Sequence, residues 1–286
     1  MIKPVQTELY AVIGNPVAHS LSPVMMNAAF RSMNVPATYL ALQADELPDD
    51  LETLARFGFR GLSVTLPHKE LAYRLADHVD DMARTIGAVN TLMREGSAWI
   101  GCNTDWLGAT KALRRVTELE GKEALILGAG GAARAVAFGM KREGARVTVA
   151  NRCVEKGKAL AKSFRCDFIP LAILDRARFD RHFDVVVQCT SVGLQGTIPT
   201  VLVSDSFFEP GMVVMETVYR PLRTPFLNAA KRAGATIVHG TDMLVYQGVA
   251  QLEWWLSRPI PEFPCVAAMK EAIHEVLSKE KNAQDD

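Results

Sequence analysis

The chain has 286 residues, which is enough for two modest domains or a single large one. Its formal net charge is zero and it carries no basic stripe, which argues against a protein that binds nucleic acid. No apolar run approaches the roughly 20 residues that a membrane-spanning helix needs. Hydrophobic residues make up 49% and charged residues 22% of the chain, as is typical of a globular protein with a packed core.

The first ten residues, MIKPVQTELY, lack the charged-then-apolar pattern of a secretory signal, so we expect a cytoplasmic protein. The five cysteines are widely spaced and form no CxxC pair, which favours free thiols in a reducing compartment. The six histidines are scattered as well and form no HExxH motif. We therefore expect no metal site.

Strands and helices are predicted to alternate along the first hundred residues. A short apolar run stops at Gly14-Asn15-Pro16, and Ser22-Pro23 then opens a helix with Ser22 as its N-cap. A hairpin is expected across Glu95-Gly96. The strands are expected over residues 9–13, 37–42, 61–66, 88–94 and 98–102, and the helices from 22, over 47–57, from 68 to 75 and over 104–116.

A second unit with the same alternation is expected to begin near Gly121. Strands that alternate with helices predict an α/β fold with a Rossmann-type, doubly wound parallel sheet. The strands are expected over residues 124–127, 146–150, 184–188, 212–216 and 236–238, and the helices over 132–143, 155–163, 225–233, 243–256 and 266–279.

A glycine-rich loop joins the first strand of this second unit to its helix. It reads Gly128-Ala129-Gly130-Gly131-Ala132-Ala133, which fits the pattern G-x-G-x-x-A. Glycines let the backbone turn tightly and approach a pyrophosphate, and the helix start offers unpaired N–H groups. The plain alternative is a tight turn without a ligand, but such a turn needs one glycine rather than three in four residues. The loop therefore predicts a bound dinucleotide.

The end of the following strand bears on which dinucleotide is bound. NAD-binding proteins usually carry an acidic residue there, which accepts from the ribose 2′-hydroxyl. This chain has Asn151-Arg152 instead, and Lys156 follows one helical turn later. A guanidinium group can pair with a 2′-phosphate, so the pattern favours NADP over NAD. The plain alternative is that Arg152 and Lys156 form a solvated surface pair.

Polar residues stand near strand and helix ends where a simple core would not place them. Several have a plain structural reading, such as a helix cap for Ser22 or Asp105 and a solvated surface for Lys69. Two serines around one turn can also hold a carboxylate or a diol, and clefts of α/β proteins open at the carboxyl ends of strands. The strings that carry these residues are GNPVAHSLSP with Ser20 and Ser22, SVTLPHK with Thr65 and Lys69, GAVNT with Asn90, GCNTD with Asp105, and MLVYQG with Gln247.

Taken together, these strings resemble the shikimate dehydrogenase (shikimate/quinate dehydrogenase) family over about residues 9 to 257. The resemblance implies NADP-dependent, reversible reduction of 3-dehydroshikimate to shikimate in the chorismate pathway of aromatic amino-acid biosynthesis. It also implies contacts for the substrate: Ser20 and Ser22 with Tyr219 at the carboxylate, and Thr65, Asn90 and Gln247 at the ring hydroxyls. The residues that it places along the cofactor, beyond the glycine loop and Asn151 to Lys156, are Thr190, Ser191, Gly240 and Met243, with Thr217 as a further candidate.

Within this resemblance, Lys69 and Asp105 are the implied catalytic pair. Lys69 can donate a proton to the developing alkoxide and accept one in the reverse reaction. Partial burial would favour its neutral amine, whereas Asp105 would favour and orient the ammonium form. The hypothesis is that Lys69 is the acid/base group and that Asp105 orients it and the reacting hydroxyl.

The chain also departs from the family pattern. Cys153 stands where Thr is usual, which weakens one contact to a 2′-phosphate, and Ser63 stands where many members have Asn, which could alter the accepted hydroxyl pattern. Met26, Gln188, Cys189 and Glu216 depart as well. The alternatives are a quinate/shikimate dehydrogenase that uses NAD or NADP, and a binding homologue without catalysis. Because no dehydratase-like segment leads the sequence, we expect a monofunctional protein.

Two domains follow from the distribution of these motifs. Residues 1–105 with 243–286 are expected to bind the substrate, and residues 106–242 are expected to bind NADP. Gln247 follows the nucleotide-binding segment yet matches a substrate contact, so the chain should return to the first domain. We expect a monomer or a homodimer with a small-molecule substrate and with neither a nucleic-acid nor a membrane partner.

Overall fold

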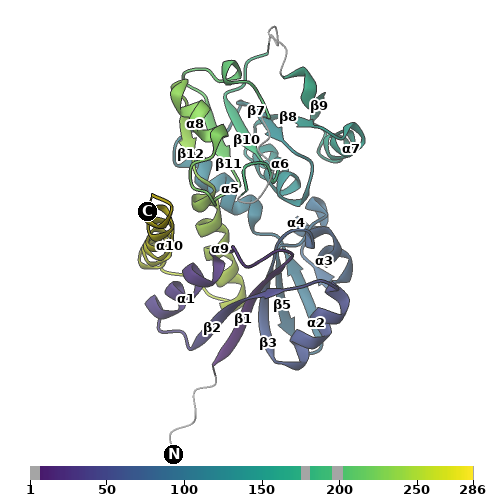
Figure 1. The fold of residues 1–286 in the computed structure, drawn as a ribbon. Coiled ribbons are helices and arrows are strands. Elements are labelled where there is room, and N and C mark those ends of the chain that lie inside the picture. Colours follow the sequence, from purple (N-terminus) through teal and green to yellow (C-terminus); the bar gives the residue numbers. More distant parts are fainter. Residues whose placement is uncertain (1–6, 175–180, 195–201, 286) are drawn as a thin grey trace, which may run out of the picture. The chain divides into compact units, whose positions relative to one another are not determined.

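The computed structural model describes residues 7–174, 181–194 and 202–285 (Figure 1). The chain divides into two compact units, Met1–Thr104 together with Leu244–Asp286, and Asp105–Met243. Each unit is built on a six-stranded sheet, one mixed and one entirely parallel. The predicted α/β fold class is therefore confirmed. In the described parts of the chain, no helix has the length and apolar character needed to cross a membrane.

The sheet of the first unit has the order β2-β1-β3-β5-β6-β4. Strand β1 pairs in parallel with both neighbours, β5 pairs antiparallel with β3 and β6, and β4 pairs in parallel with β6. The carboxyl ends of β1, β3 and β6 and the amino end of β5 therefore share one edge of the sheet. The strands are β1 (Glu8–Gly14), β2 (Ala37–Gln43), β3 (Phe59–Val64), β4 (His78–Val79), β5 (Thr91–Glu95) and β6 (Ala98–Cys102).

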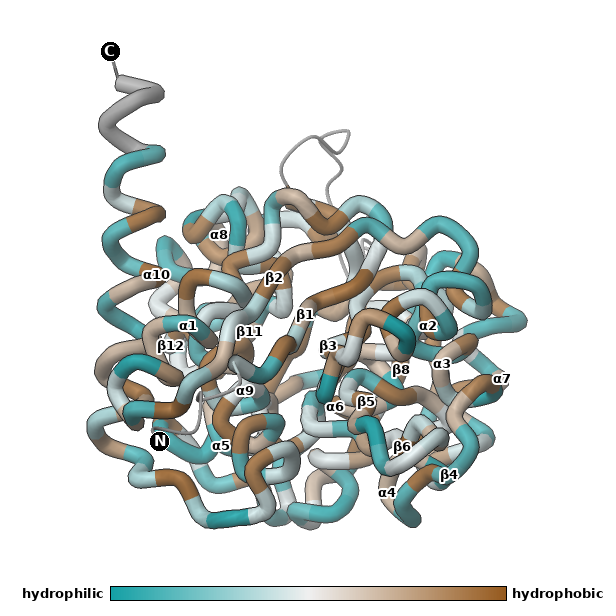
Figure 2. The backbone as a smooth tube through the Cα atoms, turned by 90° about the horizontal axis from the view of Figure 1, so that it is seen from below, coloured by the Kyte–Doolittle hydropathy of each residue, from teal (hydrophilic) through white to brown (hydrophobic). Residues whose placement is uncertain are grey.

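Among the described residues, six helices belong wholly or mostly to this unit. Helix α9 begins at Gly240 in the second unit and continues into the first, where it lies beside the strands (Figure 1). Helix α10 packs against α1, and hydrophilic and hydrophobic segments alternate along it in Figure 2. Their bounds are α1 (Ser22–Ser32), α2 (Leu47–Arg56), α3 (Lys69–Leu75), α4 (Asp81–Ile86), α9 (Gly240–Leu256) and α10 (Glu262–Asp285).

The sheet of the second unit has the order β12-β11-β10-β7-β8-β9, with all pairs parallel. Numbered within the unit, this is the order 6-5-4-1-2-3 of dinucleotide-binding sheets. The strands are β7 (Glu123–Leu127), β8 (Arg146–Asn151), β9 (Asp167–Pro170), β10 (Val185–Gln188), β11 (Val213–Glu216) and β12 (Thr236–Val238), and the helices are α5 (Asp105–Arg114), α6 (Gly131–Arg142), α7 (Val154–Phe164) and α8 (Pro225–Arg232), with short 3-10 turns at Leu171–Ile173 and Asp205–Phe207.

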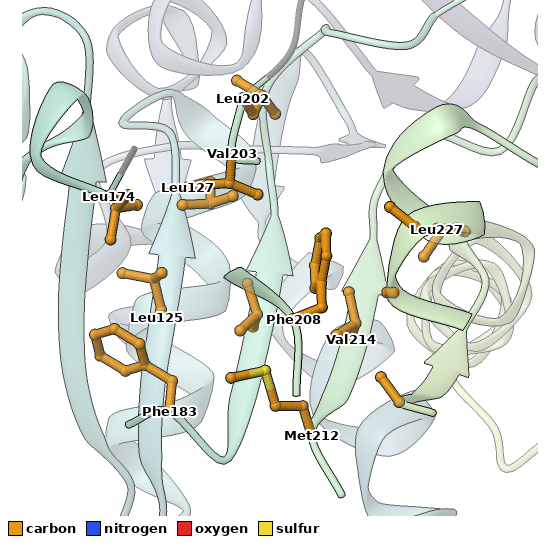
Figure 3. Packing of buried hydrophobic residues seen from close by; sticks show 14 of the residues in the cluster. Leu125, Leu127, Leu174, Phe183, Leu202, Val203, Phe208, Met212, Val214 and Leu227 are labelled. Carbon is orange, nitrogen blue, oxygen red and sulfur yellow. The ribbon is translucent and has the colours of Figure 1, made fainter. Parts of the chain in front are cut away.

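Apolar side chains from these strands and from the segments around them form the core of the second unit. Figure 3 shows Leu125, Leu127, Phe183 and Val214 turned into one cluster, and all four are fully buried. Buried strands that read as continuous apolar runs are typical of a sheet covered on both faces. The alternation of strands and helices predicted a parallel sheet, and the buried apolar residues give this sheet the core that a parallel sheet requires.

One local expectation, that Ser22 caps the first helix, is wrong. Leu21 occupies the N-cap position with helical backbone angles, φ −85° and ψ −4°, and Ser22 is the first residue of α1. The hydroxyl of Ser20 instead accepts a hydrogen bond from the Ser22 backbone N–H at 3.2 Å. A serine caps a helix only from an extended backbone, and the preceding turn does not provide one here.

Several boundaries also differ from the expected ones. The strand expected over residues 88–94 begins only at Thr91, so Asn90 lies just before it. Strands β4 and β9 were not expected, because one has two residues and the other ends in proline. The last two helices are longer than expected and begin earlier, at Gly240 and Glu262.

Candidate active site

The glycine-rich loop lies where β7 gives way to α6, next to the end of β10. Gly128 has φ +119°, and its N–H donates to the Ala150 carbonyl at 2.8 Å. A Cβ at this position would lie 3.1 Å from Thr190 Cγ2 and 3.3 Å from the Cys189 carbonyl carbon. Both the backbone conformation and the space therefore call for glycine. The loops after β7 and β10 meet at the point where the strand order reverses, which is where α/β sheets bind ligands.

The start of α6 fits an anionic group. Gly130 is its N-cap residue with an extended backbone, φ −90° and ψ −172°, and has no side chain with which to cap the helix. A Cβ on Gly130 would meet no described atom within 4 Å, so the first N–H groups of the helix have open space beside them. Ala129 and Ala132 are half-buried, and Gly131 is buried. This arrangement could hold the pyrophosphate of a dinucleotide.

The end of β8 brings cationic side chains to the same edge of the sheet, since β8 pairs in parallel with β7. Asn151 ends the strand, and its Nδ2 donates to the Cys153 carbonyl at 2.8 Å. Arg152, Cys153 and Lys156 are all exposed to solvent. Their exposure leaves the two cations accessible to a 2′-phosphate, and it equally suits an ordinary solvated surface.

The loop after β10 is held by a buried amide and a buried carboxyl group. Gln188 Nε2 donates to the Val192 carbonyl at 2.8 Å and to Glu216 Oε1 at 2.9 Å. Gln188 Oε1 accepts from the Thr190 backbone N–H, and Glu216 Oε2 accepts from the Thr224 hydroxyl. The residues Gln188 and Glu216, which depart from the family pattern, therefore fix the backbone of Thr190 and Val192.

Burial raises the pKa of Glu216 to about 7, although hydrogen bonds from Thr224 and Gln188 oppose the shift. A raised carboxyl pKa means that the folded protein binds the proton more tightly than the unfolded chain. Stability from this group is thus complete below the ordinary pKa of 4.5 and is lost as the pH rises through about 7.

A Glu216→Gln variant should lack this pH dependence, because an amide does not ionise. We expect the free energy of unfolding of the original chain to fall, relative to the variant, by on the order of 3 kcal/mol across that pH window. Urea unfolding of both proteins at several pH values between 4.5 and 8 measures the difference. Parallel pH profiles would show that Glu216 does not titrate in this range.

The remaining residues implied for the cofactor lie after β11 and β12. Thr217 follows β11, and its N–H donates to the Gln188 carbonyl at 2.9 Å. A Cβ on Gly240 would lie 2.8 Å from the Thr217 carbonyl oxygen, so the start of α9 passes close to this strand end. Met243 is buried within the first turns of α9.

Tyr219, which the resemblance implies for the substrate carboxylate, is half-buried in the loop after β11 and belongs to the second unit.

In the first unit, the residues implied for the substrate gather at one edge of the sheet. Ser20 and Ser22 follow β1, and Thr65 and Lys69 follow β3, whose carboxyl end lies beside that of β1. A Cβ on Gly14 would lie 2.4 Å from Thr65 Cγ2, so glycine at the end of β1 makes room for Thr65. Ser22 is buried, whereas Ser20, Thr65 and Lys69 are half-buried.

Asn90 and Gln247 are joined directly, although 157 residues separate them in the sequence. Asn90 Nδ2 donates to Gln247 Oε1 at 3.3 Å and to Thr104 Oγ1 at 3.0 Å. Both amides are buried, and Gln247 Nε2 also donates to the Leu244 carbonyl at 2.8 Å. Buried amides with several partners have fixed orientations. The sequence did not indicate Thr104 as a partner of Asn90.

The backbone ties Lys69 to the segment that carries Asn90. Lys69 is the first residue of α3, and its carbonyl accepts from the Val89 N–H at 2.9 Å. Asp105 is the first residue of α5, is 4% exposed and belongs by its contacts to the second unit.

Over residues 7–174, 181–194 and 202–285, no group of three His, Cys, Asp or Glu residues is arranged to hold a metal ion.

The fold and the glycine-rich loop define an α/β protein whose second unit has the strand order of dinucleotide-binding sheets. The chain belongs to the shikimate dehydrogenase family, because it matches three of its sequence profiles. These are the shikimate dehydrogenase substrate binding domain at residues 12–92, shikimate/quinate 5-dehydrogenase at 110–196, and the shikimate 5′-dehydrogenase C-terminal domain at 240–274.

Known shikimate dehydrogenases are similar to this protein over nearly the whole chain. A shikimate dehydrogenase (NADP(+)) of Syntrophobacter fumaroxidans is 99% identical over 286 residues, which is 100% of both chains. A shikimate dehydrogenase solved in complex with NADP+ is 34% identical with a TM-score of 0.86, covering 95% of this chain and 96% of the other. The Thermus thermophilus enzyme, solved with NADP(H) and shikimate, is 36% identical with a TM-score of 0.83. The match covers 93% of this chain and 100% of the other.

Proposed function

We propose that this protein is an NADP-dependent shikimate dehydrogenase, which reversibly reduces 3-dehydroshikimate to shikimate in the chorismate pathway. The observation that carries the proposal is the buried pair of amides, Asn90 and Gln247, at the edge of the mixed sheet. Amide groups both donate and accept, which suits a ring with several hydroxyls. The full-length likeness to the Syntrophobacter fumaroxidans enzyme supports the same substrate and cofactor.

The substrate contacts are proposed by residue type and position. Ser20 and Ser22 offer hydroxyl donors to the ring carboxylate after β1, and the Tyr219 hydroxyl is a further donor for it. Thr65, Asn90 and Gln247 pair with the ring hydroxyls. A site that is built to bond hydroxyl groups rejects analogues that lack them, because its buried polar groups would then be unpaired.

The cofactor contacts are proposed in the second unit. The backbone of Gly128 to Ala132 would hold the pyrophosphate, and Asn151, Arg152, Cys153 and Lys156 would surround the 2′-phosphate. Near the nicotinamide we propose Thr190, Ser191, Thr217, Gly240 and Met243. Bound NADPH supplies a hydride from C4 of its nicotinamide to the substrate ketone.

Lys69 and Asp105 are proposed to manage the proton. As the ketone oxygen gains negative charge, the Lys69 ammonium donates a proton to it, and in the reverse direction the amine takes that proton back. The carboxylate of Asp105 would orient the ammonium and the reacting hydroxyl. We also propose that the enzyme is cytoplasmic and is a monomer or a homodimer. Sedimentation velocity would give its size in solution.

The decisive experiment is a panel of initial rates with shikimate and with quinate, each with NADP+ and NAD+. We expect the highest kcat/KM for shikimate with NADP+. Quinate carries one more hydroxyl, on the ring carbon that bears the carboxylate. Equal rates with quinate would identify a quinate/shikimate dehydrogenase instead, and no rate in any combination would identify a binding homologue.

A further inference from the structure

Helix α9 is bonded to the start of β5 through side chains spaced four residues apart, Gln247, Gln251 and Trp255. Residues at this spacing lie on one face of a helix. The middle one, Gln251, is 1% exposed, and its Nε2 donates to Thr91 Oγ1 at 2.9 Å and to the Asn90 carbonyl at 3.3 Å. The helix therefore contacts the Asn90 segment through Gln251 as well as through Gln247.

The other end of the Gln251 amide is also engaged. Its Oε1 accepts from Ser63 Oγ at 2.7 Å, and Ser63 in turn accepts from the Tyr39 hydroxyl at 2.5 Å. Ser63 is buried, so its hydroxyl serves the interior of the fold. Because both ends of Gln251 have partners, its amide cannot rotate without breaking a buried hydrogen bond, which is costly.

Thr91 passes this constraint to Asn90. The Thr91 hydroxyl accepts from Gln251 and donates to Asn90 Oδ1 at 2.7 Å. Asn90 Oδ1 also accepts from the Thr104 backbone N–H at 2.8 Å, so the amide is oriented with Nδ2 toward Gln247 Oε1 and Thr104 Oγ1. Each hydroxyl donates in one direction along this chain, and hydrogen bonds aligned in this way polarise and strengthen one another.

We propose that Gln251 is a positioning residue which, through Thr91 and with support from Ser63, fixes the amide of Asn90 for recognition of a substrate hydroxyl. The inference rests on the proposed function, in which Asn90 and Gln247 bind the ring. It assigns Ser63 an indirect influence on the substrate, through Gln251 rather than by contact with the ring.

The test is a Gln251→Met variant, which keeps the length of the side chain and removes both hydrogen-bonding groups. Thr91 then loses its donor, and the Asn90 amide loses the support that Gln251 gives through Thr91, while its bonds to Thr104 and Gln247 stay. We expect the KM for shikimate to rise about tenfold and the KM for NADP+ to stay within about twofold of the original value. A loss of general stability would not separate the two constants in this way.

Two further variants complete the experiment. Trp255→Phe removes a buried hydrogen bond of the same helix, from Trp255 Nε1 to the Leu92 carbonyl at 3.0 Å, and should lower Tm without changing the KM for shikimate. Thr91→Val is isosteric and breaks the relay beyond Gln251, so it should reproduce the shikimate effect. Because both changes break one relay, the effect of combining Thr91→Val with Gln251→Met should be smaller than the product of the single effects.

The outcomes separate the inference from the function on which it rests. If the unaltered protein does not oxidise shikimate, the proposed function fails. If it does, an unchanged shikimate KM in Gln251→Met overturns the inference, as does an equal rise in both KM values or an equal effect of Trp255→Phe. Should Gln251→Met not fold, the same criteria apply to Thr91→Val.

Discussion

Replacement of Lys69 by alanine should lower kcat for shikimate oxidation by about 10²- to 10⁴-fold, the usual contribution of a general acid–base group. Lys69 is half-buried at the first residue of α3, and its backbone is bonded to Val89, next to Asn90. The backbone of Lys69 thus lies beside the segment that carries Asn90, which is proposed to bind the ring. Steady-state rates at saturating shikimate and NADP+ give the change in kcat.

Two controls sharpen this experiment. Lys69→Arg keeps the positive charge, but a guanidinium group does not give up its proton in proteins, so this variant should be impaired as well. Arg74→Ala removes an exposed cation from the same helix and should leave kcat unchanged. A Lys69→Ala enzyme with kcat close to that of the original protein would refute the assignment of Lys69 as the acid/base group.

Replacement of Arg152 by alanine should lower kcat/KM with NADP+ by about 10- to 100-fold, the range that charge-assisted hydrogen bonds provide. The same change should leave kcat/KM with NAD+ nearly unaltered, because NAD+ has no 2′-phosphate. Arg152 directly follows β8, beside the glycine-rich loop, and is exposed to solvent. Initial rates with both cofactors at saturating shikimate measure the two values.

Lys158→Ala is the matched control for Arg152, since Lys158 is an exposed cation on α7 that has no proposed contact with the cofactor. It should change neither value. An equal loss with NADP+ and NAD+ in the Arg152 variant would mean that Arg152 supports the fold or the adenine rather than the 2′-phosphate. Because Cys153 stands where the family pattern has a hydroxyl, we expect Arg152 to be the more important contact of the two.

Features that depend on a short stretch of chain could be predicted from the sequence. The strand, glycine loop and helix from β7 to α6 are local, and each is set by hydropathy and glycine content. The expectation that Ser22 caps α1 failed, because the position of the cap depends on the backbone angles of Leu21, which composition does not determine. Strand β4 has two residues and exists because it pairs with β6, a partner that its own sequence does not indicate.

The sequence motifs single out candidate site residues one by one, but they do not give the arrangement of these residues. Asn90 and Gln247 were singled out by their motifs, whereas their direct contact required the structure. Gln251 was not singled out, although it stands four residues after Gln247 in an apolar helix, a spacing that places both on one face. Its partners Ser63 and Thr91 lie 188 and 160 residues away, and no local pattern connects them. The catalytic roles of Lys69 and Asp105 stay predictions.

The return of the chain to its first unit has a consequence for synthesis on the ribosome. The second unit is one continuous segment, Asp105–Met243, and can complete its sheet as soon as that segment has emerged. The first unit begins earlier but lacks α9 until the segment after Met243 has emerged, so Asn90, Thr91 and Leu92 wait for their partners Gln247, Gln251 and Trp255. The part of the protein made first is therefore finished last, and its buried polar groups are exposed to water throughout that interval.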